Sequence, residues 1–349
     1  MIAVSTQSNQ TKLQDCTVSA PTALPAWQTA LAQAITDPAE LIAVLGLDPA
    51  LLPAAKAAAK LFPLKVPRGF VARMEYGNPH DPLLRQILPL GLESLETQGF
   101  AADPVGDMAS RIAPGVLHKY HGRALLIATG ACGVHCRYCF RRHFPYGEET
   151  ASSQHWQPAL SAIQNDTSIR ELILSGGDPL SLNDRRLREL SEGLTHIPHL
   201  KRLRIHTRQP IVLPERIDAG LLQWLDSVTL QKVMVLHVNH PNELSKEVID
   251  ACHALTQHGV RLLNQSVLLK GVNDSDQVLI DLSEALFDAG IQPYYLHLLD
   301  RVQGAAHFEV TEITAQTLMR ALLKKLPGFL VPKLVREVPG HTSKTPVAF

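Results

Sequence analysis

The chain is organised around the stretch Gly130–His143, GACGVHCRYCFRRH. It places Cys132, Cys136 and Cys139, three of the five cysteines, within eight residues in a CxxxCxxC arrangement. Thiolates are soft ligands, and three of them on one short loop can hold one face of an iron–sulfur cluster. No cysteine nearby supplies a fourth ligand. One iron of such a cluster would therefore be open to a small molecule.

Two other interpretations of the three cysteines are compatible with their spacing. They could form half of a zinc site that His135 or His143 completes, or they could be thiols that sense the redox state. CxxxCxxC is not a common zinc spacing, because zinc knuckles usually pair CxxC units. A disulfide framework is not expected in a chain of 349 residues with five cysteines and no secretory signal.

The composition argues against several classes of function. Lys plus Arg and Asp plus Glu number 33 each, so no overall field points to nucleic acid or to an anionic membrane as a partner. No apolar run reaches the roughly 18 residues of a membrane span. The polar first 25 residues do not have the pattern of a signal peptide. We expect a cytoplasmic protein, since thiols stay reduced in that compartment.

The first third of the chain predicts helices and a connecting segment. The Ala- and Leu-rich stretch 27–61 predicts two or three helices, with capping signals at Asp37-Pro38 and Asp48-Pro49. Frequent Pro and Gly in 62–121 predict a connection that contains one short helix near 82–96. We expect the helical stretch 27–61 to pack against the rest or to form oligomers rather than to carry chemistry.

From Arg123 onward, short apolar runs alternate with amphipathic helical stretches. The predicted strands are 124–129, 171–176, 202–207, 233–238, 261–269 and 293–299. The helices predicted between them are 184–194, 214–225, 243–259 and 277–290. This alternation predicts an α/β fold with a parallel sheet and right-handed crossovers. Six strands are too few for a closed eight-fold barrel, so we expect a partial (β/α)6 barrel.

In such a barrel, functional side chains lie at the carboxyl ends of the strands. Polar groups of this sequence gather there: the cysteine loop, Ser175–Pro179, His206–Arg208, His237–Pro241 and Asp300-Arg301 follow five strands, while Asn264 and Gln265 lie in another. Each group alone would suit a core polar residue or a helix cap. Their shared position at one end of six consecutive strands favours a site.

Two further features bear on ligands. In SGGDP, Gly176 and Gly177 would let the backbone approach a ligand, and Asp178 would cap the next helix or accept a hydrogen bond from an ammonium; a plain turn is the alternative. In VPGHTSKTP (338–346), Lys344 is either a solvated lysine or one that can bond covalently to pyridoxal phosphate (PLP). A phosphate needs donors, and the candidates are His118, Lys119, Tyr120, Arg123, Arg141 and Arg142, with a solvated basic face as the alternative.

The spacing of the cysteines resembles that of the radical S-adenosylmethionine (SAM) enzymes, whose open iron is chelated by SAM. From about Asn78 to Phe349 the chain resembles the lysine 2,3-aminomutase family of radical SAM, PLP-dependent enzymes. Within that family it is most similar to the short bacterial members that act in β-lysylation of elongation factor P. The matching motifs are DPLLRQILP (81–89), PGVLHKYHGRALL (114–126), CGVHCRYCFRR (132–142), LSGGDPL (174–180), TRQP (207–210), HVNHP (237–241), NQSVLLKGVND (264–274), YYLHLLDRVQGAAHF (294–308) and PGHTSKTPV (339–347).

This resemblance implies roles for individual residues. A [4Fe–4S] cluster would be held by Cys132, Cys136 and Cys139. The SAM side would be lined by Gly176, Gly177, Asp178, His237 and Gln265. PLP would bind to Lys344, with its phosphate near Lys119, Tyr120 and Arg123. The substrate α-carboxylate would pair with Arg141, and the substrate ε-ammonium would meet Asp300 and Glu337.

The implied reaction converts L-α-lysine to β-lysine. A 5′-deoxyadenosyl radical would take hydrogen from C3, and PLP would assist migration of the amino group from C2 to C3. The implied partners are free L-lysine, an external electron donor such as flavodoxin and, indirectly, elongation factor P through a separate ligase; a homo-oligomer is compatible with them. The alternatives are an aminomutase for another amino acid, another radical SAM reaction without PLP, and a cluster or zinc protein that only binds a partner.

Two departures from the family pattern modify these expectations. Glu337 stands where clostridial-type members have aspartate, which keeps the charge and adds one methylene. The acidic pair with Asp300 favours lysine over glutamate as substrate. Ser275 stands where longer members place a zinc-binding cysteine, so we expect no structural zinc. The implied organisation is a loose tail (1–25), a helical and connecting region (26–121), a radical SAM partial barrel (122–308) and a short C-terminal PLP-binding segment (309–349).

Overall fold

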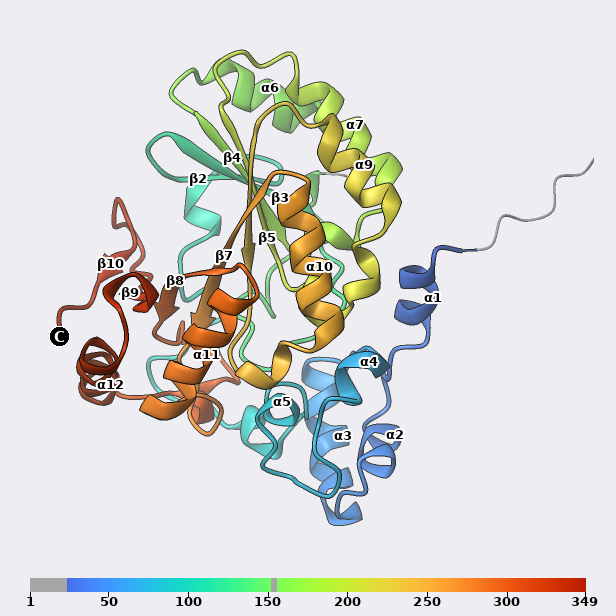
Figure 1. Cartoon of the computed structure of the whole chain (residues 1–349), viewed down its shortest axis with the longest axis vertical. Coiled ribbons are helices and arrows are strands. Elements are labelled where there is room, and N and C mark those ends of the chain that lie inside the picture. The colour runs from blue at the N-terminus through green and yellow to red at the C-terminus, as the bar shows by residue number, and fades with distance from the viewer. Residues whose placement is uncertain (1–23, 152–155) are drawn as a thin grey trace, which may run out of the picture.

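The computed structural model describes residues 24–151 and 156–349, and a single mixed sheet runs through it (Figure 1). The strands lie side by side in chain order from β1 to β10. Their bounds are β1 Arg111–Ala113, β2 Val116–Tyr120, β3 Arg123–Thr129, β4 Glu171–Gly176, β5 Arg202–Thr207, β6 Gln231–Leu236, β7 Val260–Val267, β8 Gln292–His297, β9 Lys333–Arg336 and β10 Thr345–Pro346. Strands β3 to β9 are parallel, whereas β1 and β2 at one edge and β10 at the other are antiparallel to their neighbours.

The six predicted strands are present as β3 to β8, and the α/β fold class is confirmed. Besides the antiparallel edge strands β1, β2 and β10, the prediction missed β9, which pairs in parallel with β8. It has only four residues, KLVR, too few to show an alternation. The C-terminal segment therefore contributes a strand to the sheet instead of lying outside it. The predicted domain limits remain a prediction.

The helices between the parallel strands cover one face of the sheet (Figure 1). They are α6 Gln157–Asn165, α7 Asp184–Leu194, α8 Gln209–Val212, α9 Ala219–Ser227, α10 Lys246–Gln257, α11 Asp276–Asp288 and α12 Glu312–Lys325. Helix α7 has the predicted bounds because Asn183 accepts a hydrogen bond from the Arg186 amide and apolar residues recur at helical spacing. Helix α9 begins later than predicted, since Asp218 caps it and residues 214–216 form a separate 3-10 turn.

The N-terminal region consists of short helices, as predicted. They are α1 Ala26–Ala32, α2 Pro38–Val44, α3 Leu52–Leu61, α4 Arg68–Val71 and α5 Pro82–Arg85. Asp37 caps α2, and Asp48 caps a 3-10 turn that leads into α3. The single helix predicted near 82–96 is wrong: α5 ends at Arg85, and a separate 3-10 turn occupies Gly91–Ser94. Of the predicted tail, residues 1–23 lie outside the described residues.

This N-terminal region holds the cysteine loop. The His135 amide donates to the Lys65 carbonyl, and the Arg137 amide donates to the Gln86 carbonyl, each at 2.9 Å. The guanidinium of Arg137 donates to Glu93 from Nε at 2.8 Å, and Arg142 reaches the same carboxylate, also at 2.8 Å. All three of these side chains are buried. The segment predicted as a mere connection (62–121) therefore positions the loop that carries the cysteines.

We expect Glu93→Ala to destabilise the fold by about 3–5 kcal/mol, because it leaves two buried guanidinium groups without their carboxylate. Glu40→Ala, which breaks the exposed pair with Arg68, should cost about 0–1 kcal/mol. Denaturant unfolding followed by circular dichroism gives both free energies. Equal losses in the two variants would show that the buried pair does not hold the loop.

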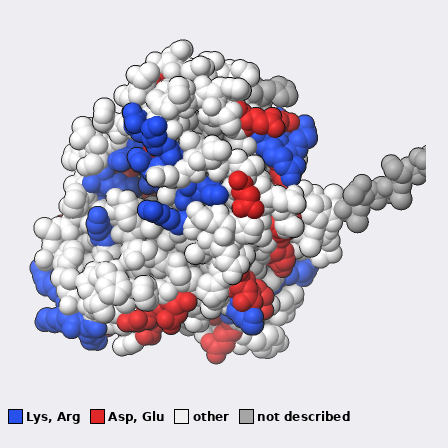
Figure 2. Space-filling model, turned by 45° about the horizontal axis from the view of Figure 1, so that its top comes forward, with Lys and Arg blue, Asp and Glu red and all other residues white. Residues whose placement is uncertain are grey.

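The surface carries both signs of charge. Figure 2 shows a group of Lys and Arg in the upper left part of the visible face, and further basic residues at its lower left and upper right, where some lie beside Asp and Glu. The chain as a whole has no net charge. Among the described residues, no helix is long and apolar enough to cross a membrane.

Candidate active site

The cysteine loop leaves the carboxyl end of β3 and packs against the end of β4. The Gly177 amide donates to the Thr129 carbonyl at 2.7 Å, and the Asp178 amide donates to the Ala131 carbonyl at 2.8 Å. A Cβ on Gly177 would lie 2.5 Å from the Ala131 carbonyl oxygen. A Cβ on Gly176, whose φ is +112°, would lie 2.7 Å from the Thr129 carbonyl oxygen. The two glycines thus admit the backbone of the cysteine loop, and their predicted contact with SAM stays a prediction.

We expect Gly177→Ala to displace this loop, at a cost of about 1–3 kcal/mol, because the new methyl group meets backbone that cannot turn away. The matched control is Gly147→Ala, since Gly147 follows the same loop and a Cβ there meets nothing within 4 Å. Iron content after anaerobic reconstitution measures the consequence for the cysteines. Full iron binding by Gly177→Ala would mean that the loop tolerates the shift.

The sequence suggested that Asp178 either caps the next helix or accepts a hydrogen bond from a ligand ammonium, and in the structure it acts as a cap. Its Oδ1 accepts from the Leu180 amide at 3.0 Å and from the Thr207 hydroxyl at 2.6 Å. Its Oδ2 accepts from the amides of Arg208 at 2.7 Å and Gln209 at 3.1 Å. The carboxylate is buried and ties the turn after β4 to the end of β5. Since both oxygens already accept two donors from the protein, a direct bond to a ligand ammonium would compete with these contacts.

The three cysteines of the loop are partly buried and form no disulfide. Burial raises the pKa of Cys139 to about 11 and places the pKa of Cys132 well above its usual value. No three His, Cys, Asp or Glu side chains converge on one point where a single metal ion would sit, in the part of the chain that the structure describes. A cubane cluster takes one thiolate on each of three irons, so its ligands need not converge in this way. The donor set therefore suits a cluster of soft metal ions.

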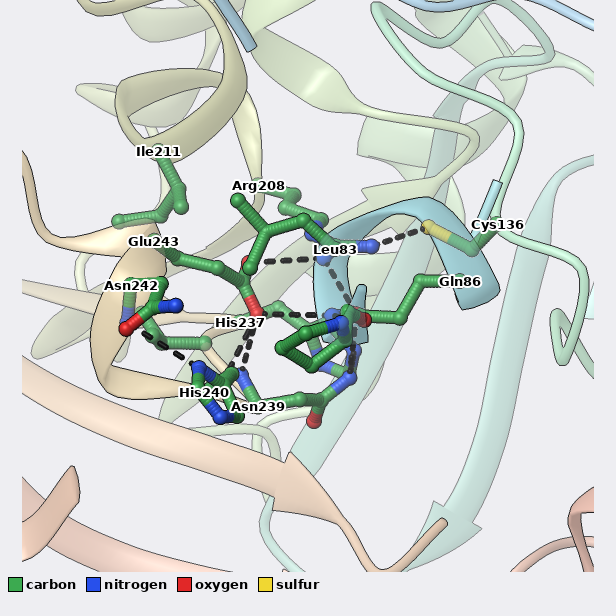
Figure 3. A network of polar contacts seen from close by, with 12 residues as sticks. Leu83, Gln86, Cys136, Arg208, Ile211, His237, Asn239, His240, Asn242 and Glu243 are labelled. Carbon is green, nitrogen blue, oxygen red and sulfur yellow. Dashed lines mark hydrogen bonds and ion pairs between the residues drawn. The ribbon is translucent and has the colours of Figure 1, made fainter. Parts of the chain in front are cut away.

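Beside Cys136 lies a buried polar network that includes the predicted residue His237 (Figure 3). The ring nitrogen Nε2 of His237 is 2.8 Å from the Tyr138 hydroxyl, and the two rings stack with centroids 5.6 Å apart. Burial lowers the pKa of His237 to about 3, so its ring is neutral. Gln265 lies on the neighbouring strand β7, and its backbone hydrogen-bonds to His237. The two predicted SAM-side residues are thus close to one another and to the cysteine loop.

A second group of predicted residues is joined by a continuous chain of ion pairs. Arg141 Nε is 2.8 Å from Asp107, and the other oxygen of Asp107 is 2.7 Å from Lys119 Nζ. Lys119 Nζ is 3.8 Å from Glu337, which is in turn 2.9 Å from Lys344 Nζ. The chain connects Arg141, which follows the cysteines, to Lys344 near the C-terminus. It brings together residues that lie more than two hundred positions apart in the sequence.

The remaining predicted residues of this group surround Lys344. The Tyr120 hydroxyl donates to Glu337, and the Arg123 guanidinium lies 4.8 Å from the centre of the Tyr120 ring. Lys344 Nζ lies 5.9 Å from the centre of the Tyr295 ring. Burial raises the pKa of Asp300 to about 7, and Lys344 opposes this shift. Asp300 is therefore near enough to Lys344 for their charges to interact.

Sequence reasoning assigned no individual role to four residues of this site. Asp107 joins Arg141 to Lys119, and Arg208 donates to Cys136. His206 on β5 and His297 on β8 each have a buried Nε2 without a hydrogen-bond partner among the described residues. Burial lowers the pKa of both histidines well below the usual value, and the charge of Lys344 acts in the same direction. His206 and Arg208 were signalled by their position at a strand end, whereas nothing in the sequence pointed to Asp107 or assigned His297 more than a place in a strand.

The Nε2 atoms of His206 and His297, which have no hydrogen-bond partner among the described residues, indicate whether the site suits a bound group. Buried polar atoms normally have a partner, so two neutral rings without one are expected where a polar ligand binds. His206 shares one face of β5 with Arg202 and Arg204, whereas Leu203 and Ile205 on the other face pack under the helices. Lys119, Arg123 and Arg141 bring cationic groups that suit a phosphate or a carboxylate, although Lys119 and Arg141 also pair with Asp107. The residues present therefore fit PLP and an amino acid.

Comparisons with known proteins agree with this geometry. Residues 121–202 match the family described as 4Fe-4S single cluster domain. The chain is 52% identical over 322 residues to the L-lysine 2,3-aminomutase of Escherichia coli (strain K12), covering 92% of this chain and 94% of the relative. It is 48% identical to the L-lysine 2,3-aminomutase of Haemophilus influenzae, covering 91% and 94%. Identity to the L-lysine 2,3-aminomutase of Clostridium subterminale is 34%, covering 80% and 67%. The chain belongs to the L-lysine 2,3-aminomutase family.

Proposed function

We propose that this chain is an L-lysine 2,3-aminomutase that converts L-α-lysine to β-lysine with a [4Fe–4S] cluster, SAM and PLP. The observation that carries the proposal is the ion-pair chain from Arg141 to Lys344, with Asp300 beside it and the cysteine loop adjacent. It offers a guanidinium for a carboxylate and two acidic groups for an ammonium. Those are the two ends of a lysine molecule, and they support lysine over an acidic substrate.

The residues divide the work as follows. Cys132, Cys136 and Cys139 hold the cluster, and His237 and Gln265 line the SAM side together with the SGGDP turn. Lys344 anchors PLP, while Lys119, Tyr120 and Arg123 face its phosphate. When bound, these groups supply a carbon-centred radical at C3 and a path for the amino group from C2 to C3. The protein itself binds, orients and shields the substrate.

Lys344 has a constraint that the sequence did not reveal. Its Nζ is paired with Glu337 at 2.9 Å. An amine that bonds covalently to PLP would have to be neutral, so Lys344 would hold the cofactor only with this contact opened. Glu337 would then be free to face the substrate ε-ammonium beside Asp300.

Arg141 is prepared for the substrate carboxylate by contacts on one side. Asp107 accepts from Nε, and the Ser175 hydroxyl accepts from Nη1 at 3.0 Å. These contacts fix the plane of the guanidinium, and no partner of Nη2 lies among the described residues. A guanidinium held in one plane suits a planar carboxylate. Arg141 would therefore orient the α-carbon relative to C3 before hydrogen is removed.

The wider context of the reaction is also part of the proposal. An external one-electron donor such as flavodoxin would reduce the cluster, and a separate ligase would attach the product to elongation factor P. The support is the resemblance to the short bacterial members of the family. A cytoplasmic location accompanies these partners.

Anaerobic turnover tests the proposal. The protein is reconstituted with iron, sulfide and PLP and reduced with dithionite; after addition of SAM and L-lysine, β-lysine and 5′-deoxyadenosine are quantified by chromatography. Both products are expected. Cleavage of SAM without β-lysine would overturn the choice of substrate, and L-glutamate and L-alanine assayed in parallel would show whether another amino acid is used.

Asp300 predicts the pH dependence of lysine use. Its raised pKa of about 7 means that it is protonated, and cannot pair with the substrate ammonium, below that pH. The value of kcat/KM for lysine should therefore fall about tenfold for each pH unit below 7, because this parameter reports groups of the free enzyme. Glu337, whose pKa is held below its usual value by Lys344 although burial works in the other direction, stays charged in this range.

The comparison for this pH profile is Asp300→Asn, which should show a low kcat/KM that no longer depends on a group of pKa near 7. Asp276→Asn removes an exposed carboxylate that pairs with Lys325, and it should keep the wild-type profile. A pH limb near 7 that persists in Asp300→Asn would assign it to another group.

A further inference from the structure

We propose that Arg208 raises the reduction potential of the cluster by donating a hydrogen bond to Cys136, and that Glu243 limits this effect. The inference rests on the proposed cluster at the three cysteines. Arg208 neither touches the substrate nor binds iron in this proposal. Arg208 is therefore a positioning residue that acts through a cluster ligand.

The contacts of Arg208 carry the inference (Figure 3). Its Nη1 is 2.8 Å from Cys136 Sγ and 2.8 Å from the Tyr138 hydroxyl. Its Nη2 is 2.7 Å from Glu243 and 2.6 Å from the side-chain oxygen of Gln86. The residue is only 5% exposed. One guanidinium thus connects the cysteine loop to two other regions of the chain, around Gln86 and Glu243.

This arrangement is held rigidly. The Arg208 amide donates to Asp178, and its guanidinium lies 5.6 Å from the centre of the Phe70 ring. Glu243 is fixed in turn, since its Oε1 accepts from the Asn239 amide at 2.9 Å and the His240 amide at 3.1 Å. The donor to Cys136 therefore cannot swing away to solvent. Its position is set by the ends of β5 and β6, and not by the cysteine loop itself.

The direction of the effect follows from charge. Reduction adds one electron to the cluster, and no bond forms or breaks in that step. A cationic donor on a ligand sulfur stabilises the added negative charge, so it raises the potential. The carboxylate of Glu243 on the far side of the guanidinium offsets part of that charge. Removing Arg208 should lower the potential, and neutralising Glu243 should raise it.

If Arg208 and Glu243 had only structural roles, replacing them would not shift the reduction potential in opposite directions. The test is a redox titration of the reconstituted cluster followed by electron paramagnetic resonance, without SAM or lysine. At a fixed applied potential near the wild-type midpoint, the ratio of reduced to oxidised cluster should fall at least about threefold in Arg208→Gln and rise in Glu243→Gln. Arg216→Gln is the matched control, because Arg216 is also buried and paired with a carboxylate, Asp184, yet it contacts none of the cysteines that the structure describes.

The inference is overturned if Glu243→Gln leaves the ratio unchanged or lowers it, or if Arg216→Gln shifts it as much as Arg208→Gln. Glu243→Gln keeps the guanidinium and the shape of its partner, so it remains informative if Arg208→Gln does not fold. Wild-type protein that forms β-lysine while the potentials do not move would refute this inference alone. A normal cluster with the expected shifts but no β-lysine would refute the proposed function alone.

Discussion

Lys344→Ala is expected to abolish β-lysine formation while the cluster still assembles. The reason is that Lys344 is the amine placed among the phosphate-binding candidates Lys119, Tyr120 and Arg123, and paired with Glu337. Without it PLP has no covalent anchor in the site. Two measurements check this expectation: chromatography of the product, and the absorbance of PLP bound to the protein. Iron content should match that of the wild type.

The structure offers one competing amine and one good control. Lys119 lies 3.8 Å from the same carboxylate, so it is the alternative anchor. Borohydride reduction of the wild-type protein with PLP, followed by mass spectrometry of its peptides, identifies which lysine is labelled. Lys333→Ala removes an exposed lysine of β9 and should retain full activity. Labelling of Lys119, or β-lysine formation by Lys344→Ala, would contradict the assignment of Lys344.

Cys136→Ala is expected to lose the cluster and with it all cleavage of SAM. Three protein thiolates leave one iron open, and removing one of them leaves the cluster with only two. Burial of the loop adds to the effect, because water has poor access to the position that the missing thiolate leaves. Iron and sulfide content, visible absorbance after reconstitution and 5′-deoxyadenosine production measure the outcome.

Cys252→Ala is the matched control for this variant. Cys252 is fully buried in α10 as part of the core between the helices and the sheet, and it makes no contact with the loop. Its replacement should leave iron content and SAM cleavage unchanged. A Cys136→Ala protein that still binds four irons and cleaves SAM would remove the cysteine loop from the proposed mechanism.

Local patterns in the sequence predicted most of the sheet. Strands β3 to β8 alternate with helices in the order that the apolar runs indicate. The caps at Asp37 and Asp48 were visible because a capping side chain bonds an amide only two residues ahead. Prediction failed where the segments were short. Strand β9 has four residues. The region 82–96 contains the four-residue helix α5 before Pro89 and a 3-10 turn after it.

The three cysteines, the alternation of strands and helices and the edge of the sheet that carries the polar residues can all be read from the sequence. Each of these depends on neighbours within a few positions or on the rule that parallel strands end on one side. The contacts that hold the site appear only in the folded chain. Asp107 meets Arg141 from 34 positions away, and Gln86 meets Arg208 from 122 positions away. No local pattern encodes such partners, because they are chosen by how the N-terminal region and the strand ends pack, and by the need to pair every buried charge.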